Sequence, residues 1–232
     1  TPECTTPWDA VRYVLAGDRI LDQLGQELTR QRPYLTEVML SRINVSYETR
    51  ATWGCHESYL HRTVPSALAE QLIPHLVSRI VFAGAGGFNT EEHGISFLVS
   101  PRAPHLARER SGDSTHDRGI FHTKDESLAG PGFHRLHLLC GESLCSHLAQ
   151  WLKVGTTALV VAMIEHGIHP GADLAMPSPV TALQTFARDP ACTARAATRG
   201  AGLLSAIAIQ RRYLAAAERQ AGATFMPSWT DV

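Results

Sequence analysis

The chain has 232 residues and nearly balanced charge, with 21 Lys and Arg against 22 Asp and Glu, which leaves a net charge of −1. This length can bury a substantial core, but no run of basic residues offers the concentrated positive surface that nucleic acid needs. The longest apolar stretch, residues 158–164, is far shorter than the ~20 residues of a membrane span, so we expect no membrane partner. The five cysteines form no CxxC pair, which predicts reduced thiols and a cytoplasmic location.

Residues 7–30 have the pattern of an amphipathic helix, in which Thr6 can act as the cap, Pro7 suits the first turn and Asp9 completes a capping-box spacing. Further helices are predicted over residues 65–80, 146–165, 180–188 and 203–220. Strands are predicted over residues 34–43, 53–61, 95–100, 119–123 and 134–141, and polar loops over 44–52 and 102–118. Strands come first and helices dominate later, which favours an α+β fold with an antiparallel sheet backed by helices.

The segment around residues 56–61 contains two histidines but lacks the spacing of a zinc hydrolase helix. His56 and His61 are five residues apart, whereas that helix needs two histidines four apart on one face. We expect a strand, on which His56 and Ser58 share one face while Glu57 and Tyr59 share the other. A single histidine is about as often a partly buried core residue as a ligand, and both interpretations stay open.

Arg135 and His137 are two residues apart on the predicted strand 134–141, so both side chains project from one face and Leu136 from the other. An arginine offers a charge-assisted fork to phosphate, and a neutral histidine offers a nitrogen ligand to a metal. The pair is therefore a candidate site for phosphate and metal. The alternative is that Arg135 forms an ion pair with a neighbouring carboxylate, and the sequence does not decide between them.

Other motif-like residues have simpler interpretations. Gly84, Gly86 and Gly87 follow a predicted helix rather than a strand, so they end that helix and do not form a dinucleotide fingerprint. Lys153 lacks the glycine spacing of a phosphate-binding loop, and we expect it to reach a helix end or to pair with an acid. Cys55 has no evident partner groups for nucleophilic catalysis, so a small core thiol is the better interpretation.

Together these residues resemble the family of Pup ligases and Pup deamidase/depupylases, which act on the prokaryotic ubiquitin-like protein Pup and have a glutamine synthetase-like catalytic domain. The resemblance extends from residue 1 to about residue 212. Its main segments are residues 2–5 (Pro-Glu-Cys-Thr), 54–57 (Gly-Cys-His-Glu), 76–79 (Leu-Val-Ser-Arg), 135–137 (Arg-Leu-His), 152–156 (Leu-Lys-Val-Gly-Thr) and 188–190 (Arg-Asp-Pro). The first segment is closer to the deamidase/depupylase branch and the second to the ligase branch, so the branch stays open.

The resemblance implies a site that uses ATP and Mg2+ on the concave face of the sheet. At matching positions, Glu3, His56 and His137 would bind metal, while Arg135 and His137 would contact the nucleotide. The partner would be Pup, or a Pup-like small protein, and its conjugates. The expected activity is cleavage of a glutamyl amide or isopeptide bond, with isopeptide ligation as the alternative. The resemblance assigns no catalytic residue.

Several positions depart from the family pattern: Ser58 stands where the family has Asn, Lys124 where it has Arg, and residues 142–144 read Glu-Ser-Leu where it has Asp-x-Asn. These changes keep two further hypotheses open, a degraded relative that only binds a partner and a generic α+β domain. We predict that residues 1–222 form a catalytic domain without its N-terminal strands, and that residues 223–232 are a tail leading to a missing C-terminal part of a longer protein.

Overall fold

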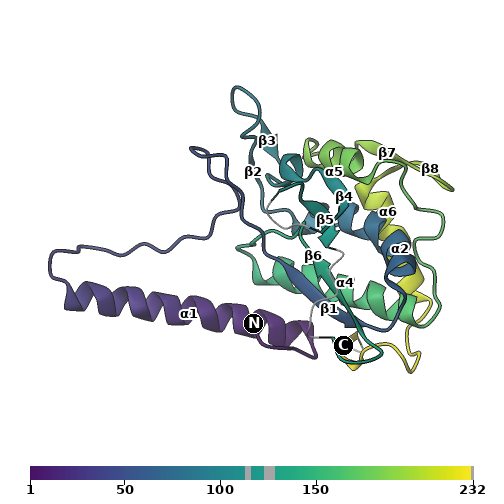
Figure 1. The fold of residues 1–232 in the computed structure, drawn as a ribbon, viewed down its shortest axis with the longest axis horizontal. Helices are drawn as coiled ribbons and strands as arrows, with labels where there is room; N and C mark the ends of the chain where they lie inside the picture. Colours follow the sequence, from purple (N-terminus) through teal and green to yellow (C-terminus); the bar gives the residue numbers. More distant parts are fainter. Residues whose placement is uncertain (113–115, 123–128, 231–232) are drawn as a thin grey trace.

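The computed structural model describes residues 1–112, 116–122 and 129–230, and shows a four-stranded sheet packed against helices (Figure 1). The helices are α1 (Pro7–Gln31), α2 (Pro65–Ser78), α3 (Ile80–Ala83), α4 (His147–Glu165), α5 (Pro179–Ala187) and α6 (Ala206–Glu218), with short 3-10 helices η1 (Ala103–His105) and η2 (Ser228–Thr230). The strands are β1 (Glu57–His61), β2 (Gly87–Phe88), β3 (Phe97–Leu98), β4 (Arg108–Ser111), β5 (Gly119–His122), β6 (His134–Leu138), β7 (Arg195–Thr198) and β8 (Gly202–Ser205).

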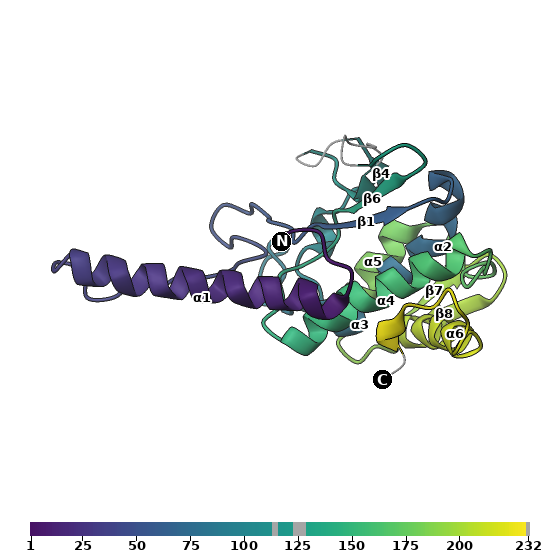
Figure 2. The same ribbon diagram turned by 90° about the horizontal axis from the view of Figure 1, so that it is seen from below.

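The main sheet has the strand order β1-β6-β5-β4, with helices on one side of it (Figure 2). The pairs β1–β6 and β5–β6 are antiparallel, and Ser58 and His122 both lie opposite His137. The α+β prediction of an antiparallel sheet backed by helices is confirmed, and this sheet also holds one parallel pair, β4–β5. Strand β4 lies within residues 102–118, which the sequence predicted to be a polar loop. It forms a strand despite its polar side chains because its backbone pairs with the buried strand β5.

The core lies between the helices and one face of the sheet. Strand residues Ile120, Leu136 and Leu138 are buried against it, and the helices contribute Leu68, Leu72 and Leu76 from α2, Val160, Met163 and Ile164 from α4, and Ile209 from α6. Each such side chain contributes about 1.5–3 kcal/mol relative to an exposed one. α4 is the one helix in the described part of the chain that is long and apolar enough to cross a membrane, but it packs against α1, α2, α3 and α6 as a central helix of this core.

Helix α1 begins as its capping residues predict, because the Thr6 side chain accepts a hydrogen bond from the Asp9 N–H. Only its first part packs on the body, where Trp8 lies 5.2 Å from Trp151 of α4. The rest extends away from the body, and the segment after residue 32 runs back beside it (Figure 1). A cleft of about 650 Å³ lies between α1 and residues 36–42.

Three predicted elements differ clearly from those observed. Residues 34–43 form no strand, because the chain here runs along α1 and has no partner strand for its backbone. The strand predicted over residues 95–100 is reduced to β3, which pairs with β2 alone among the described strands. The helix predicted from residue 203 begins at Ala206 with Ser205 as its cap, because the residues before it pair with β7 as strand β8, a hairpin that the sequence analysis missed.

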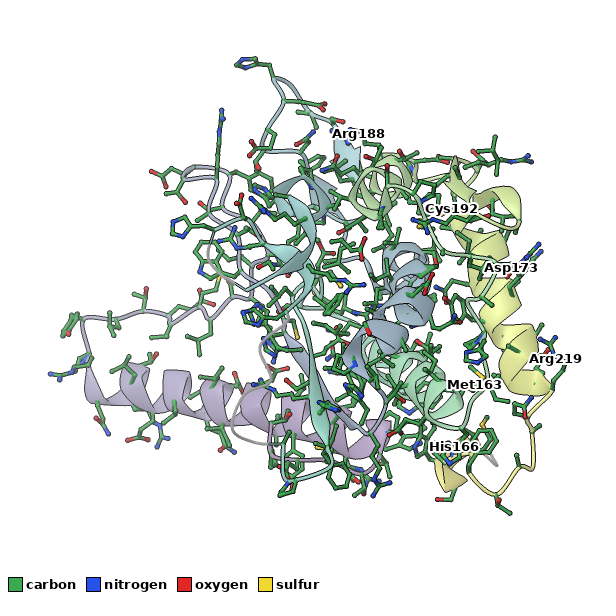
Figure 3. All side chains as sticks on the ribbon, turned by 45° about the vertical axis from the view of Figure 1, so that its right-hand side comes forward. Met163, His166, Asp173, Arg188, Cys192 and Arg219 are labelled. Atoms are coloured by element: carbon green, nitrogen blue, oxygen red, sulfur yellow. The ribbon has the colours of Figure 1, made fainter. Side chains whose placement is uncertain are left out.

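The predicted strand 119–123 is observed as β5, and residues 123–128 of the family resemblance lie outside the described residues. The predicted tail, as far as residue 230, packs back on α4. The Phe225 ring stacks on His166 with centroids 4.4 Å apart, and Trp229 lies 6.3 Å from Trp151. Figure 3 labels Met163 of α4 and His166, the residue that follows α4, next to this segment.

His75 of α2 generates a prediction for the acid stability of the fold. Its ring is fully buried, with Nε2 3.2 Å from the Thr157 hydroxyl, and burial together with the Arg79 charge lowers the pKa of His75 from 6.5 to about 3. The unfolded chain therefore binds a proton that the folded chain excludes, and stability is lost as the pH falls from 6.5 toward 3. In His75→Gln the unfolding free energy should depend less on pH in this range, by up to about 1.4 kcal/mol per pH unit. Urea denaturation at several pH values measures this slope, and equal slopes for the two proteins would contradict the prediction.

Candidate functional site

The sheet face turned away from the core carries a cluster of polar side chains. Ser58 and His137 face each other across β1 and β6, with the serine Oγ 3.1 Å from the histidine Nδ1. Arg135 donates to both, at 3.0 Å from its Nη2 to the Ser58 Oγ and 3.0 Å to the His137 Nδ1. The alternation of β1 and β6 brings these three groups together, as the sequence predicted for each strand separately.

Two further imidazole rings lie beside His137. The ring of His56, just before β1, is 5.2 Å from it and edge-on, and the ring of His122 on β5 is 5.7 Å away. A guanidinium only donates hydrogen bonds, so the Nδ1 of His137 accepts from Arg135 and the proton of the neutral ring sits on Nε2. His137 would have to give up the Arg135 contact or move this proton in order to bind a metal.

His56 is exposed at the surface, although neighbouring groups cover part of its ring. Burial and the positive charge of Arg102 lower the pKa of His56, so the ring stays neutral at neutral pH. A neutral imidazole is the form that binds a metal. His56 and His137 therefore fit the ligand role that the resemblance implies, as far as their own chemistry goes.

Glu3 is not part of this cluster. It is exposed in the irregular segment before α1, and nothing in the structure brings its carboxylate to His56 or His137. Within the described ranges no group of three or more His, Cys, Asp or Glu side chains is arranged to hold a metal ion. The structure thus brings together His56, Arg135 and His137, and a metal-binding role for Glu3 stays a prediction.

A buried ion pair lies directly beneath the cluster, on the other face of β1. Glu57 accepts hydrogen bonds from Arg79 at 2.6 and 2.9 Å and from the Tyr59 hydroxyl at 2.7 Å. Arg79 also donates to the Thr157 hydroxyl of α4 at 2.6 Å, and its side chain is only 2% exposed. Burial alone would raise the pKa of Glu57, but Arg79, Lys153 and these hydrogen bonds hold it below its usual value. The shared face of Glu57 and Tyr59 was predicted, whereas Arg79 was recognised only as part of a family segment.

A second buried network fixes the chain on either side of His56. The Arg102 guanidinium donates to the carbonyls of Leu139 and Gly141 at 2.8 and 2.5 Å, and Glu142 accepts from the Arg102 N–H at 2.9 Å. The guanidinium lies so close over Gly54 that a Cβ there would be 2.9 Å from it, which explains why this position has no side chain. Sequence analysis gave neither Arg102 nor Glu142 a role.

Glu142 is almost completely enclosed by donors. Its two oxygens accept from the Ser100 hydroxyl at 2.8 Å and from the Ala85 N–H at 2.7 Å, in addition to Arg102. Burial nevertheless raises the pKa of Glu142. Glu142 holds the loop after β6 to the segment after α3.

Lys153 lies below the same loop and is completely buried. Its Nζ donates to the Glu142 carbonyl at 2.9 Å and lies 3.4 Å from the Sγ of Cys55. The prediction that Lys153 reaches a helix end or pairs with an acid is wrong. The Lys153 side chain leaves α4 within the helix and contacts a backbone carbonyl and a thiol. Cys55 is only partly buried.

The profile of one protein family, described as Pup-ligase protein, matches residues 1–227. The chain belongs to the Pup ligase family. It is 37% identical over 224 residues to a depupylase of Acidothermus cellulolyticus, covering 94% of this chain and 44% of that protein. It is 34% identical over 225 residues to a Pup–protein ligase of Acidimicrobium ferrooxidans, covering 94% of this chain and 49% of that protein.

Solved structures agree with this assignment. The Pup ligase PafA in complex with ADP matches with a TM-score of 0.80 and 27% identity, covering 94% of this chain and 49% of that chain. PafA in complex with Pup matches with a TM-score of 0.78 and 26% identity, over 94% of this chain and 45% of that chain. The glutamine synthetase-like α+β fold predicted from the resemblance is thereby confirmed. The chain spans about half the length of the curated relatives it matches.

The buried ion pair beneath the cluster gives a prediction for stability. Glu57→Gln should lower the free energy of unfolding by about 3–5 kcal/mol, because it leaves the Arg79 charge buried and uncompensated. The double variant Glu57→Gln with Arg79→Met should recover much of that loss, since neither charge then remains. Glu27→Gln, which breaks an exposed ion pair with Arg30, is the matched control and should cost less than about 1 kcal/mol. Urea denaturation measures all three, and a Glu57 variant no worse than the Glu27 control would refute the role of the pair.

Proposed function

We propose that the full-length protein binds ATP with Mg2+ and cleaves a glutamyl side-chain amide or isopeptide bond of Pup or its conjugates. The observation that carries this proposal is the Arg135–His137–Ser58 cluster beside His56, an open cationic surface in a chain of the Pup ligase family. Two kinds of relative support it. One solved relative is a Pup ligase bound to ADP, and relatives at 36–37% identity are named depupylase or Pup deamidase/depupylase.

In this proposal Arg135 turns from His137 to the phosphates of the nucleotide. A guanidinium fork suits phosphate oxygens, and the partners it leaves are a hydroxyl and an imidazole that can re-pair with each other. Release of Arg135 removes one donor from the Nδ1 of His137, and a metal binding there would displace the Ser58 hydroxyl as well. His137 and His56 would then hold metal together with the carboxylate of Glu3.

Magnesium prefers oxygen ligands, so two imidazoles alone are an incomplete set for it. The remaining ligands in the proposal are phosphate oxygens, water and Glu3. When bound, the metal supplies charge stabilisation at phosphate and carbonyl oxygens. The residues of this chain bind and orient the nucleotide, while Arg79, Arg102 and Glu142 hold the strand ends that carry them.

Ligation is the second candidate, and it has its own support. The two solved structures reported above are both of a Pup ligase, and ligase relatives reach 35% identity. Both reactions need the glutamyl carbonyl polarised by nearby positive charge, and they differ in whether water or a lysine amine attacks. The departures from the family pattern, such as Ser58, keep a binding-only relative as a third possibility.

The proposed contact between Arg135 and the nucleotide phosphates leads to a prediction for the ATP affinity of an Arg135 variant. Arg135→Ala in the full-length protein should weaken ATP binding in the presence of Mg2+ by roughly 10- to 150-fold, the value of one lost charge-assisted hydrogen bond of about 1.5–3 kcal/mol. Arg212→Ala is the matched control, because Arg212 pairs with Asp173 at the far side of the helices, where Figure 3 labels the aspartate. Calorimetric titration measures both. Equal affinity of Arg135→Ala and the unmodified protein would remove Arg135 from the nucleotide site.

The reaction is tested with three substrates given to the full-length protein with ATP and Mg2+. They are Pup ending in Gln, Pup ending in Glu with a lysine-bearing acceptor, and a preformed Pup conjugate. We expect release of ammonia from the first and of free acceptor from the third, and mass spectrometry detects both. A new conjugate from the second would instead establish ligation. Inactivity with all three while ATP binds would refute an enzymatic action on Pup.

A further inference from the structure

Lys153 is an unusual residue for its position in this chain. It is one of only two lysines in the sequence, and its side chain is 0% exposed. Among the residues that the structure describes, it takes part in no ion pair, and its Nζ contacts only the Glu142 carbonyl and the Cys55 sulfur. An arginine could serve a purely structural cation role, whereas a lysine also offers a primary amine that can act as a nucleophile.

The sulfur and the amine are held at close range. The Nζ–Sγ distance is 3.4 Å, and the Cys55 backbone N–H donates to the Gly141 carbonyl at 3.0 Å. Gly141 also packs closely against the Cys55 backbone, since a Cβ on Gly141 would lie 2.3 Å from the Cys55 carbonyl oxygen. Cys55 therefore cannot swing away from Lys153 without moving the loop after β6.

Only one end of the pair is open to solvent. Cys55 is partly exposed, so a small oxidant can reach its sulfur, while the amine is sealed inside the fold. None of the other four described cysteines has a lysine amine as its neighbour. Cys145 is exposed, the Cys4 and Cys192 thiols contact the carbonyls of Pro2 and Pro190, and Cys140 faces Arg79. Cys55 is thus distinguished by the amine beside it.

We propose that Cys55 and Lys153 form a reversible covalent sulfur–nitrogen cross-link when the protein meets hydrogen peroxide. The Cys55 sulfur attacks one peroxide oxygen, the O–O bond breaks, and the other oxygen leaves as water, which gives a sulfenic acid. The Lys153 ammonium loses one proton to become the free amine, which then attacks the sulfur. The S–O bond breaks, and the hydroxyl leaves as a second water with a further proton from the nitrogen. Thiol, amine and one peroxide become a sulfenamide and two waters, so the sulfur is oxidised by two electrons and the peroxide is reduced.

The geometry favours this second step over further oxidation. A sulfenic acid exposed to more peroxide goes on to the sulfinic acid, whereas a nucleophile already in contact reacts without a diffusional encounter. An added thiol attacks the sulfur of the cross-link and restores the free amine, first as a mixed disulfide and then as the free cysteine.

The cross-link has a consequence for the candidate site, and this part rests on the proposed function. Bond formation withdraws Nζ from the Glu142 carbonyl and draws Cys55 toward α4. His56 is the next residue, and its ring lies against His137. Oxidation should therefore displace His56, the proposed metal ligand, and weaken binding of ATP with Mg2+ by roughly tenfold, which corresponds to about 1.4 kcal/mol.

The test treats the folded full-length protein with hydrogen peroxide, digests it with trypsin without reductant and analyses the peptides by mass spectrometry. We expect a linked pair of peptides, two hydrogens lighter than their sum, joined at Cys55 and Lys153. Trypsin should fail to cut after Lys153, and reductant should restore cleavage. Cys55 as a sulfenic or sulfinic acid beside an unlinked Lys153 would overturn the proposal.

Three controls make the result specific. Cys55→Ser should abolish the link, whereas Cys145→Ser, which removes an exposed thiol, should leave it. Protein unfolded in urea before oxidation should not form it, because the contact exists only in the fold, and a link formed equally well there would overturn the geometric argument. The urea control uses the unchanged sequence, so it remains decisive even if a variant misfolds.

The regulatory consequence is measured separately by titrating ATP into the reduced and the oxidised protein. Unchanged affinity after the link has formed would overturn the effect on the site. A reduced protein that binds no ATP would refute the proposed nucleotide function, while the peptide analysis would still decide whether the link forms.

Discussion

The buried ion pair between Glu57 and Arg79 is the contact on which the arrangement of the site depends. It joins the first residue of β1 to the end of α2, and through Thr157 it also joins α4. Two charges removed from water are tolerated only when their hydrogen-bonding capacity is used, and here Tyr59, Thr157 and a backbone carbonyl complete it. Because side chains alternate along a strand, anchoring Glu57 toward the helices turns Ser58 toward the open face.

The second buried network, that of Arg102 and Glu142, holds the loops at the strand ends with buried charges that are likewise hydrogen-bonded. Arg102 and Glu142 come from segments far apart in the sequence. The Arg102 backbone N–H donates to the Glu142 carboxylate, and the Arg102 guanidinium donates to the Leu139 carbonyl. Their placement leaves the Arg102 guanidinium against Gly54 and next to His56, and burial together with this charge lowers the pKa of His56. With Arg135 on the surface and Lys153 below, positive charge gathers around one end of the sheet, an environment that favours an anionic ligand.

The candidate site therefore consists of a few exposed side chains, and the interior beneath it is held by hydrogen-bonded buried charges. The Arg135–His137–Ser58 contacts are short but lie at the surface, where one partner can be exchanged for a ligand at small cost. The contacts beneath them involve fully buried charges, whose rearrangement costs far more. This difference lets Arg135 change partners while the strands that carry it remain in place.

The sequence by itself determined the elements whose signals are local. Capping by Thr6 and Asp9 fixed the start of α1, and strand alternation placed Glu57 with Tyr59 and Arg135 with His137. Such signals act over one to four residues and are legible without the fold. The family resemblance added the fold class and the expected location of the site.

The tertiary structure alone decided the rest, because it depends on residues that meet only after folding. Residues 34–43 have strand-like composition but no partner, so they form no strand, whereas the polar residues of β4 do pair, in parallel, with β5. The partners of Glu57, Glu142 and Lys153 lie 22, 40 and 98 positions away in Arg79, Arg102 and Cys55. No local pattern specifies which buried charge meets which group at such separations, since that choice is made by the packing of helices against the sheet.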